Sequence, residues 1–87
     1  MKYLVIGLGN LGRAIAESLT RIGNEVIGVD INPHKTEAVK HTISGAISLD
    51  TTDKDALNTL PLNEMDAMLL PEPQATKARL EQHVKLF

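Results

Sequence analysis

Residues 2–30 of this 87-residue chain, KYLVIGLGNLGRAIAESLTRIGNEVIGVD, decide the fold. They are predicted to form a short apolar strand, a glycine loop over residues 7–12, an amphipathic helix, and a second strand that ends in an acid. Gly7 would allow the tight turn after the strand, Gly9 lacks the Cβ that would block a pyrophosphate, and Gly12 would let the helix lie close on the sheet. The pattern predicts a dinucleotide-binding βαβ unit.

The start of the helix and the end of the second strand support this interpretation. A helix N-terminus has unpaired N–H groups and a positive dipole end, which favour a phosphate. Asp30 follows the last loop glycine at close to the spacing of about 20 residues expected of the carboxylate that binds ribose hydroxyls. A carboxylate there would repel a 2′-phosphate, which favours NAD over NADP. Two alternatives stay open: the glycines could form only a packing turn, and Asp30 could only cap the next helix.

The composition fits one small aliphatic domain. The chain is 43% hydrophobic, but Tyr3 and Phe87 are its only aromatic residues. A formal net charge of −2 gives no basic face for nucleic acid, and the lack of cysteine excludes disulfides and thiolate sites. No run is long enough to cross a membrane, so we expect no membrane insertion. Because only one lysine separates the initial methionine from the first strand, we expect no signal peptide. We also expect a cytoplasmic location.

Strands and helices are predicted to alternate along the chain. The expected strands are residues 3–6, 25–30, 46–49 and 67–70. The first expected helix runs from the glycine loop to about residue 22, and the second from 33 to about 41. A third helix is expected to begin at 52–55, and a fourth covers 74–86. This order predicts an α/β fold, a Rossmann-like parallel sheet of about four strands in the order 3-2-1-4 with flanking helices and a C-terminal helix. The ligand crevice would lie beyond the carboxyl ends of the first and fourth strands.

Local signals predict where the helices begin and which face of the first one is buried. Asn32 and Pro33 are typical of an N-cap and a first helical position. Thr52 and Asp55 resemble a capping box, with Asp in place of the usual Glu or Gln. The first helix is expected to bury an apolar stripe that consists of Leu11, Ile15, Leu19 and Ile22.

Residues 2–70 resemble the N-terminal nucleotide-binding domain of regulators of potassium conductance (RCK, or TrkA-N, domains), which occurs in Trk- and Ktr-type uptake systems and some potassium channels. The resemblance is carried by VIGLGNLGR at 5–13, NEVIGVD at 24–30, and LDTTD at 49–53 followed by Leu57. It implies a cytoplasmic domain, or one at the inner face of the membrane, that binds NAD(H) or an adenine nucleotide (ATP, ADP or AMP). It also implies control of a potassium channel or transporter subunit in the membrane.

The resemblance implies the residues of the site as well. Gly7, Gly9, Asn10, Leu11 and Gly12 would line the phosphates, Asp30 with Ile31 would hold the ribose, and Asp50 and Thr51 would lie beside the adenine. The family commonly has Gly-Asp-Ala-Thr where this chain has Leu-Asp-Thr-Thr at 49–52. Its members also continue after the fourth strand through a glycine loop, a helix and two more strands. Residues 71–87 would instead form a divergent helical tail on a single domain. Three explanations of this difference stay open: a truncated relative, a fragment, or a chain with an altered 3′ end.

Other residues give weaker signals. Arg13 could contact a phosphate or be an ordinary surface residue. His34 and His41 could share a helix face, but no third ligand lies close in sequence, so no metal site is expected. No nucleophile, acid/base pair or substrate domain is recognisable, and no catalytic residue is predicted.

Three functions follow from these patterns. The first is a regulatory module that binds a nucleotide and controls potassium transport. The alternative is the cofactor-binding half of an NAD-dependent oxidoreductase completed by another chain, and the third is a structural relic. A homodimer or higher homo-oligomer is expected, because residues 67–70 would form an edge strand. The closing helix would add an apolar stripe of Leu80, Val84 and Phe87.

Overall fold

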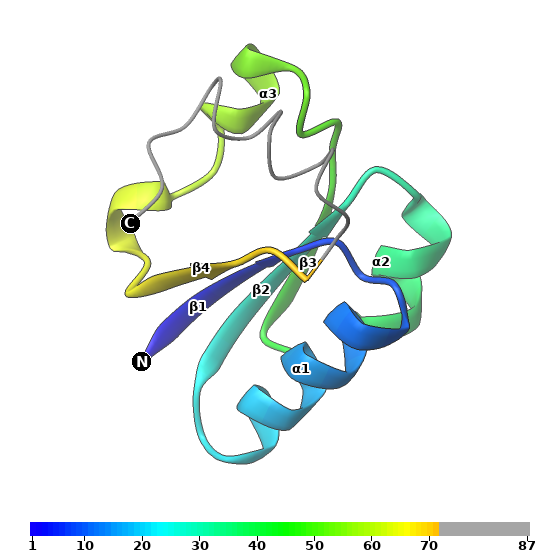
Figure 1. The fold of residues 1–87 in the computed structure, drawn as a ribbon, viewed down its shortest axis with the longest axis vertical. Helices are drawn as coiled ribbons and strands as arrows, with labels where there is room; N and C mark the ends of the chain where they lie inside the picture. Colours follow the sequence, from blue (N-terminus) through cyan, green and yellow to red (C-terminus); the bar gives the residue numbers. More distant parts are fainter. Residues whose placement is uncertain (72–87) are drawn as a thin grey trace.

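A four-stranded parallel sheet forms the centre of the molecule, with the strands in the order β3-β2-β1-β4 (Figure 1). The computed structural model describes residues 1–71. The strands are β1 (Lys2–Ile6), β2 (Glu25–Asp30), β3 (Gly45–Ser48) and β4 (Ala67–Leu69). The helices are α1 (Asn10–Arg21), α2 (Pro33–Val39), α3 (Lys54–Leu57) and the 3₁₀ helix η1 (Leu62–Glu64). The predicted fold class and strand order are confirmed. The helix predicted over 74–86 lies outside the described residues.

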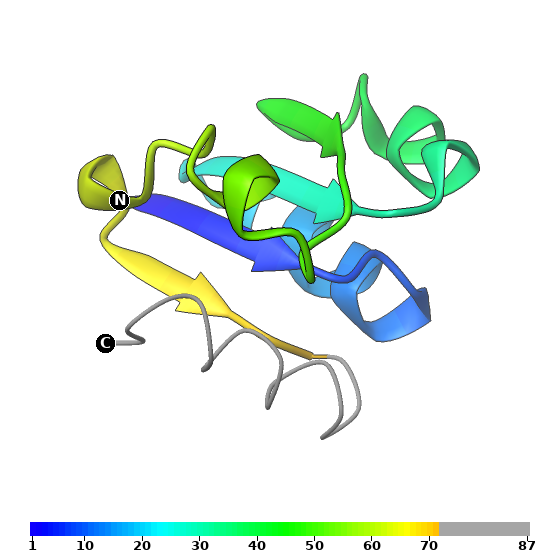
Figure 2. The same ribbon diagram turned by 90° about the horizontal axis from the view of Figure 1, so that it is seen from above.

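The sheet is covered on both faces. Figure 2 shows the four strands side by side, with α1 and α2 on one face and α3 on the other. Along β1, Leu4 and Ile6 join the cluster under α3, whereas Val5 joins the cluster under α1 and α2. All three side chains are at most 1% exposed. The continuous apolar run therefore forms a central strand buried on both faces, and each such side chain contributes about 1.5–3 kcal/mol on burial.

The register of β1 on β2 places the glycine loop beside the end of β2. Lys2 pairs with Glu25, and Ile6 pairs with Val29. The ladder continues past β1, because the N–H of Gly7 donates to the Val29 carbonyl at 2.8 Å. Continued by one residue, this register places Gly7, the first residue of the glycine loop, opposite Asp30.

The predicted apolar stripe of α1 is wrong at both ends. Leu11 is 60% exposed and Ile22 is 76% exposed, while Ile15 and Leu19 are half-buried. The buried residues of α1 are Gly12 and Ala16. At Gly12 the helix lies so close to the turn after β1 that there is no room for a Cβ.

The start of α2 is confirmed, but its end differs from the prediction. Asn32 is the N-cap, and its side chain accepts a hydrogen bond from the His34 N–H at 2.9 Å. The helix ends at Val39 rather than near residue 41. The Val39 carbonyl accepts from the amides of Thr42 and Ile43, at 3.0 and 3.2 Å. Residues 40–42 form a turn directly after the helix.

The start of α3 corrects the capping-box prediction. The N-cap is Asp53, whose Oδ1 accepts from the N–H groups of Asp55 and Ala56 at 2.9 and 3.4 Å. Thr52 does not cap the helix, because its hydroxyl donates to Asp50 at 2.6 Å. Strand β3 begins and ends one residue before the predicted 46–49, β4 ends one residue before the predicted 70, and η1 was not predicted.

Candidate nucleotide-binding site

The turn that leaves β1 depends on Gly7. Its φ of +100° lies in the region that side chains with a Cβ rarely adopt. The turn reverses the chain between the end of β1 and the start of α1, as the sequence predicted. It brings the N-terminus of α1 to the carboxyl edge of the sheet.

Gly12 provides the close approach of α1 to this turn. A Cβ on Gly12 would lie 1.8 Å from the carbonyl oxygen of Gly7, far inside any real contact. The predicted role of Gly12 in close packing is therefore confirmed, with the backbone of the turn as its partner. Gly7 and Gly12 together fix how the helix leaves the sheet.

Within residues 1–71, no side-chain cap bonds the amides at the N-terminus of α1. Gly9 is the N-cap and makes no side-chain capping bond, and the first turn contains no acid. The first helical hydrogen bond runs from the Arg13 N–H to the Gly9 carbonyl at 2.8 Å. Asn10 and Leu11 follow Gly9 and are both exposed. The leading amides and the helix dipole therefore favour an anion at this end.

Asp30 links the glycine loop to the loop after β2. Its Oδ2 accepts from the Leu8 N–H, and its Oδ1 accepts from the Asn32 N–H, both at 2.8 Å. The residue is only 8% exposed. It does not cap α2, because Asn32 does so. A carboxylate offers about four lone-pair positions, so these two bonds leave acceptor capacity for ribose hydroxyls.

The loop after β3 joins the same edge. The Ser48 hydroxyl donates to the Ile31 carbonyl at 3.2 Å, and the Leu49 N–H donates to the Asp30 carbonyl at 3.1 Å. Asp50 and Thr51 follow directly, and Asp50 accepts from both the N–H and the hydroxyl of Thr52. The structure thus brings the predicted site residues to one edge of the sheet, in the loops after β1, β2 and β3, at the end of β2 and in the first turn of α1.

Two predicted site residues expose large apolar side chains at this edge. Leu11 is 60% exposed, and Ile31 is 64% exposed. Leu11 belongs to the glycine loop, and Ile31 directly follows the carboxylate of Asp30. Both side chains offer apolar surface that a bound ligand could cover.

Leu8 is a site residue that the sequence reasoning missed. Its side chain is 3% exposed and packs in the core cluster with Val5 and Ala16, while its N–H donates to Asp30. The side chain therefore anchors the middle of the loop in the core. The signal in the sequence was an apolar residue between two loop glycines.

Arg13 lies on the surface in this structure. Its Nε is 3.4 Å from the Glu17 carboxylate, which also accepts from the Thr42 hydroxyl at 2.8 Å. The hydrogen bond from Thr42, more than the charge of Arg13, lowers the pKa of Glu17. His34 and His41 are exposed, and within residues 1–71 no cluster of three His, Cys, Asp or Glu residues is arranged to hold a metal ion.

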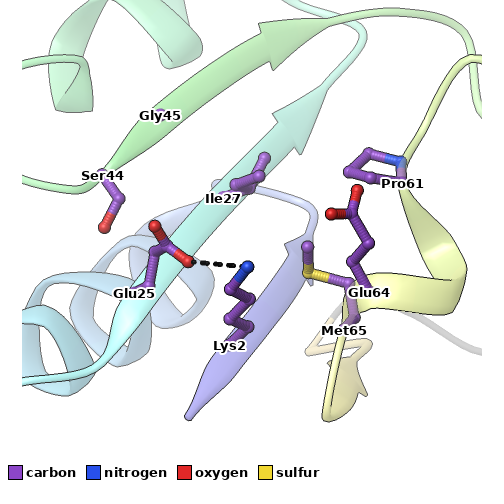
Figure 3. A pocket seen from close by; sticks show the side chains of 8 residues that line it. All are labelled: Lys2, Glu25, Ile27, Ser44, Gly45, Pro61, Glu64 and Met65. Atoms are coloured by element: carbon purple, nitrogen blue, oxygen red, sulfur yellow. Dashed lines mark ion pairs between the residues drawn. The ribbon is translucent and has the colours of Figure 1, made fainter.

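A hollow of about 220 Å³ lies at the opposite end of the sheet (Figure 3). It is lined at the starts of three strands by Lys2, Glu25 and Gly45, and from the side by Pro61 and Met65. Lys2 and Glu25 form an ion pair across it at 3.6 Å, with both side chains about half exposed. The hollow contains none of the predicted site residues, so it is separate from the glycine loop.

The fold and the carboxyl-edge loops define a Rossmann-like domain with a glycine-rich helix start and an acid at the end of the second strand. The family model of the TrkA-N domain matches residues 3–79. The chain belongs to the TrkA-N domain family, as the sequence resemblance indicated. Among the residues that the structure describes, no helix has the length and apolar content needed to span a membrane.

Curated relatives include potassium-uptake proteins. The chain is 32% identical over 69 residues to Ktr system potassium uptake protein A of Bacillus subtilis, and 30% identical to the protein of that name in Vibrio alginolyticus. Each match covers 79% of this chain and 31% of the relative, so the chain spans about a third of their length. A formate-dependent phosphoribosylglycinamide formyltransferase of Burkholderia mallei is 36% identical over 75 residues, which are 85% of this chain and 18% of that enzyme.

Solved structures confirm the fold. The NAD(P)-binding domain of an exopolyphosphatase-related protein from Archaeoglobus fulgidus matches with a TM-score of 0.82 at 24% identity, over 98% of this chain and 68% of that one. Saccharopine dehydrogenase from Saccharomyces cerevisiae matches with a TM-score of 0.77 at 24% identity, over 94% of this chain and 19% of the enzyme.

Proposed function

We propose that this domain binds NAD(H), or alternatively an adenine nucleotide, and that binding regulates potassium transport through a membrane subunit. The observation that carries the proposal is the Asp30 carboxylate, which holds the glycine loop through Leu8 and keeps acceptor capacity for a ribose. Membership of the TrkA-N family and the similarity to Ktr potassium uptake proteins support the regulatory part.

Each part of the ligand has a chemically suited partner at the carboxyl edge. The phosphates would meet the amides at the start of α1, where Gly9 adds no side chain. The ribose hydroxyls would donate to Asp30, and the adenine would lie near Asp50 and Thr51. Ile31 and Leu11 would lose exposed apolar surface on binding, which contributes about 25 cal/mol for each Å² covered.

The three linked loops suggest how binding could alter the domain. Hydrogen bonds already connect the loops after β1, β2 and β3 through Asp30, Ile31 and Ser48. A ligand that contacts all three loops would stabilise one arrangement of this edge, and so favour one state of the assembly. The proposed partner is the membrane subunit of a potassium transporter, with the domain at the cytoplasmic face of the membrane.

Calorimetric titration with NADH, NAD, ATP, ADP and AMP tests the proposal. A ligand that binds only the folded form must also raise the melting temperature. Gly9→Val should abolish both the calorimetric binding signal and the rise in melting temperature, because it places a branched side chain where the pyrophosphate would pass. Gly45→Val is the matched control at the far end of the sheet, where an added Cβ is in ordinary van der Waals contact with Ile27, at 3.9 Å. The absence of binding for every nucleotide at millimolar concentration would refute the proposal.

A homo-oligomer, most simply a twofold dimer, is proposed as the assembled form. Strand β4 has three half-buried residues and pairs with β1 along one side. Pairing through the β4 side would add core to a domain of small size. Light scattering at micromolar concentration should give more than the 9.5 kDa of one chain, and a monomer mass would contradict the expectation.

A further inference from the structure

Gly28 lies in the middle of β2, where a glycine normally weakens a strand. It is buried, and the register of the sheet places it between Val5 of β1 and Ala46 of β3. Its φ is not positive, so the backbone conformation does not require a glycine. What the glycine provides here is the space that its missing side chain leaves.

Two side chains from other segments occupy that space, Leu8 from the glycine loop and Ile43 from the connection between α2 and β3. A Cβ on Gly28 would lie 2.9 Å from Cδ1 of Ile43, and 2.9 and 3.1 Å from Cδ2 and Cδ1 of Leu8. Both residues are buried, Leu8 at 3% exposure and Ile43 at 7%, so neither can move outward without losing buried apolar surface. Two of the three nearest atoms belong to Leu8, so an added Cβ would press mainly on the glycine loop.

Strand β2 holds Leu8 at two points. The side chain packs over Gly28, and the N–H donates to the Asp30 carboxylate at 2.8 Å. Gly28 and Asp30 are two positions apart in β2, and alternate residues of a strand share one face of the sheet. The space for the side chain and the acceptor for the N–H therefore lie on the same face. Movement of Leu8 away from Gly28 would pull its N–H from the carboxylate that is proposed to bind the ribose.

We propose that Gly28 is a positioning residue of the nucleotide site. The space that it leaves receives the Leu8 side chain, and this packing keeps the glycine loop on the Asp30 carboxylate. The inference rests on the proposed nucleotide binding. It adds a residue that lies outside both the glycine loop and the loops at the carboxyl edge, and that acts through Leu8.

Hydrogen exchange of the Leu8 amide, followed by NMR in the ligand-free chain, tests the packing step. In Gly28→Ala this amide should exchange about tenfold faster relative to amides in the centres of β1 and β2, the scale of one lost hydrogen bond to a charged group. A general loss of stability would instead speed all these amides together. Val26→Ile is the matched control, because it adds one carbon to another buried position on the same face of β2. It should not affect the Leu8 amide selectively.

Leu8→Val is the compensating change, because it removes one carbon where Gly28→Ala adds one. In the double variant the amide at position 8 should regain most of its protection, and the domain most of its stability. If Gly28→Ala does not fold by itself, the double variant should still fold. A double variant no better than Gly28→Ala would show that Leu8 is not the side chain displaced, and would overturn the inference.

Titration with NADH connects this packing to the ligand. Gly28→Ala should bind NADH about tenfold more weakly than the wild type, in proportion to the loss of protection at Leu8. The double variant should recover most of the affinity, and Val26→Ile should bind as the wild type does.

The outcomes separate this inference from the proposed function. Normal exchange of the Leu8 amide in Gly28→Ala would overturn the inference, whether or not the wild type binds a nucleotide. Faster exchange with unchanged NADH affinity would overturn the positioning role and leave the proposed function intact. A wild-type chain that binds no nucleotide would overturn the proposed function and, with it, this inference.

Discussion

The Asp30 carboxylate accepts a 2.8 Å hydrogen bond from the backbone N–H of Leu8, which ties the end of β2 to the glycine loop. The acceptor and the donor residue are both buried. The same side chain is the proposed partner of the ribose. A substitution at Asp30 should therefore affect stability and nucleotide binding together.

Asp30→Ala should lower the free energy of unfolding by about 1–3 kcal/mol, because the buried Leu8 N–H loses its acceptor. Nucleotide binding should weaken by about 1.5–3 kcal/mol, the scale of a hydrogen bond to a charged group. Urea unfolding and calorimetry measure the two effects. Asp55→Ala, at an exposed position in α3, should change stability by less than about 0.5 kcal/mol. Unchanged stability in Asp30→Ala would show that the bond to Leu8 does not hold the loop.

Gly12→Ala should destabilise the domain, although alanine normally favours a helix. The new Cβ would overlap the Gly7 carbonyl oxygen at 1.8 Å, so α1 or the turn must move. Such overpacking typically costs about 1–3 kcal/mol, or a fall in melting temperature of about 4–8 °C for each kcal/mol in a domain of this size. Ser18→Ala, at an exposed position of the same helix, should raise the melting temperature slightly or leave it unchanged. A stabilised Gly12→Ala would contradict the close approach.

The chain alone should show no dehydrogenase turnover. Hydride transfer needs groups that orient a substrate and move its proton. The two predicted carboxylates at the carboxyl edge already accept hydrogen bonds from backbone amides, Asp30 from Leu8 and Asn32, and Asp50 from Thr52. NADH oxidation and NAD reduction against a panel of aldehydes, ketones and alcohols provide the measurement. Turnover within the usual enzyme range of about 1–1000 per second would favour the oxidoreductase alternative.

The sequence predicted the features that depend on local backbone chemistry. The apolar run of β1, the Gly7 turn and the Asn32-Pro33 helix start each follow from residues next to one another. Strand order also followed, because right-handed crossovers leave few topologies for alternating strands and helices. These features place all the predicted site residues at one edge of the sheet.

Features that depend on contacts between distant segments were not predictable in the same way. Periodicity assigned Leu11 and Ile22 to the core, but the buried residues of α1 are Gly12, which lies against the Gly7 carbonyl, and Ala16. The bond between Thr42 and Glu17 joins residues 25 positions apart. Thr52 was a plausible cap until the structure showed its hydroxyl bonded to Asp50. Several polar side chains could serve as the hydrogen-bond partner of each of these threonines, and the tertiary structure decides which one does.

The bond from Thr42 to Glu17 predicts a specific effect of pH. It is the largest cause that lowers the pKa of Glu17 from its ordinary value of 4.5. Because the folded-state pKa is the lower one, the contribution to stability is present above about pH 4.5 and is lost as the pH falls through the folded-state pKa.

Thr42→Val keeps the shape and removes the donor, so the pKa of Glu17 should rise, and less stability should be lost on acidification. Glu37 is the internal control, because its pKa is lowered by Lys40 and should not change. NMR titration of the two side-chain carboxyl groups in both proteins measures this, and an unchanged Glu17 curve in Thr42→Val would contradict the anchoring of Glu17 by Thr42.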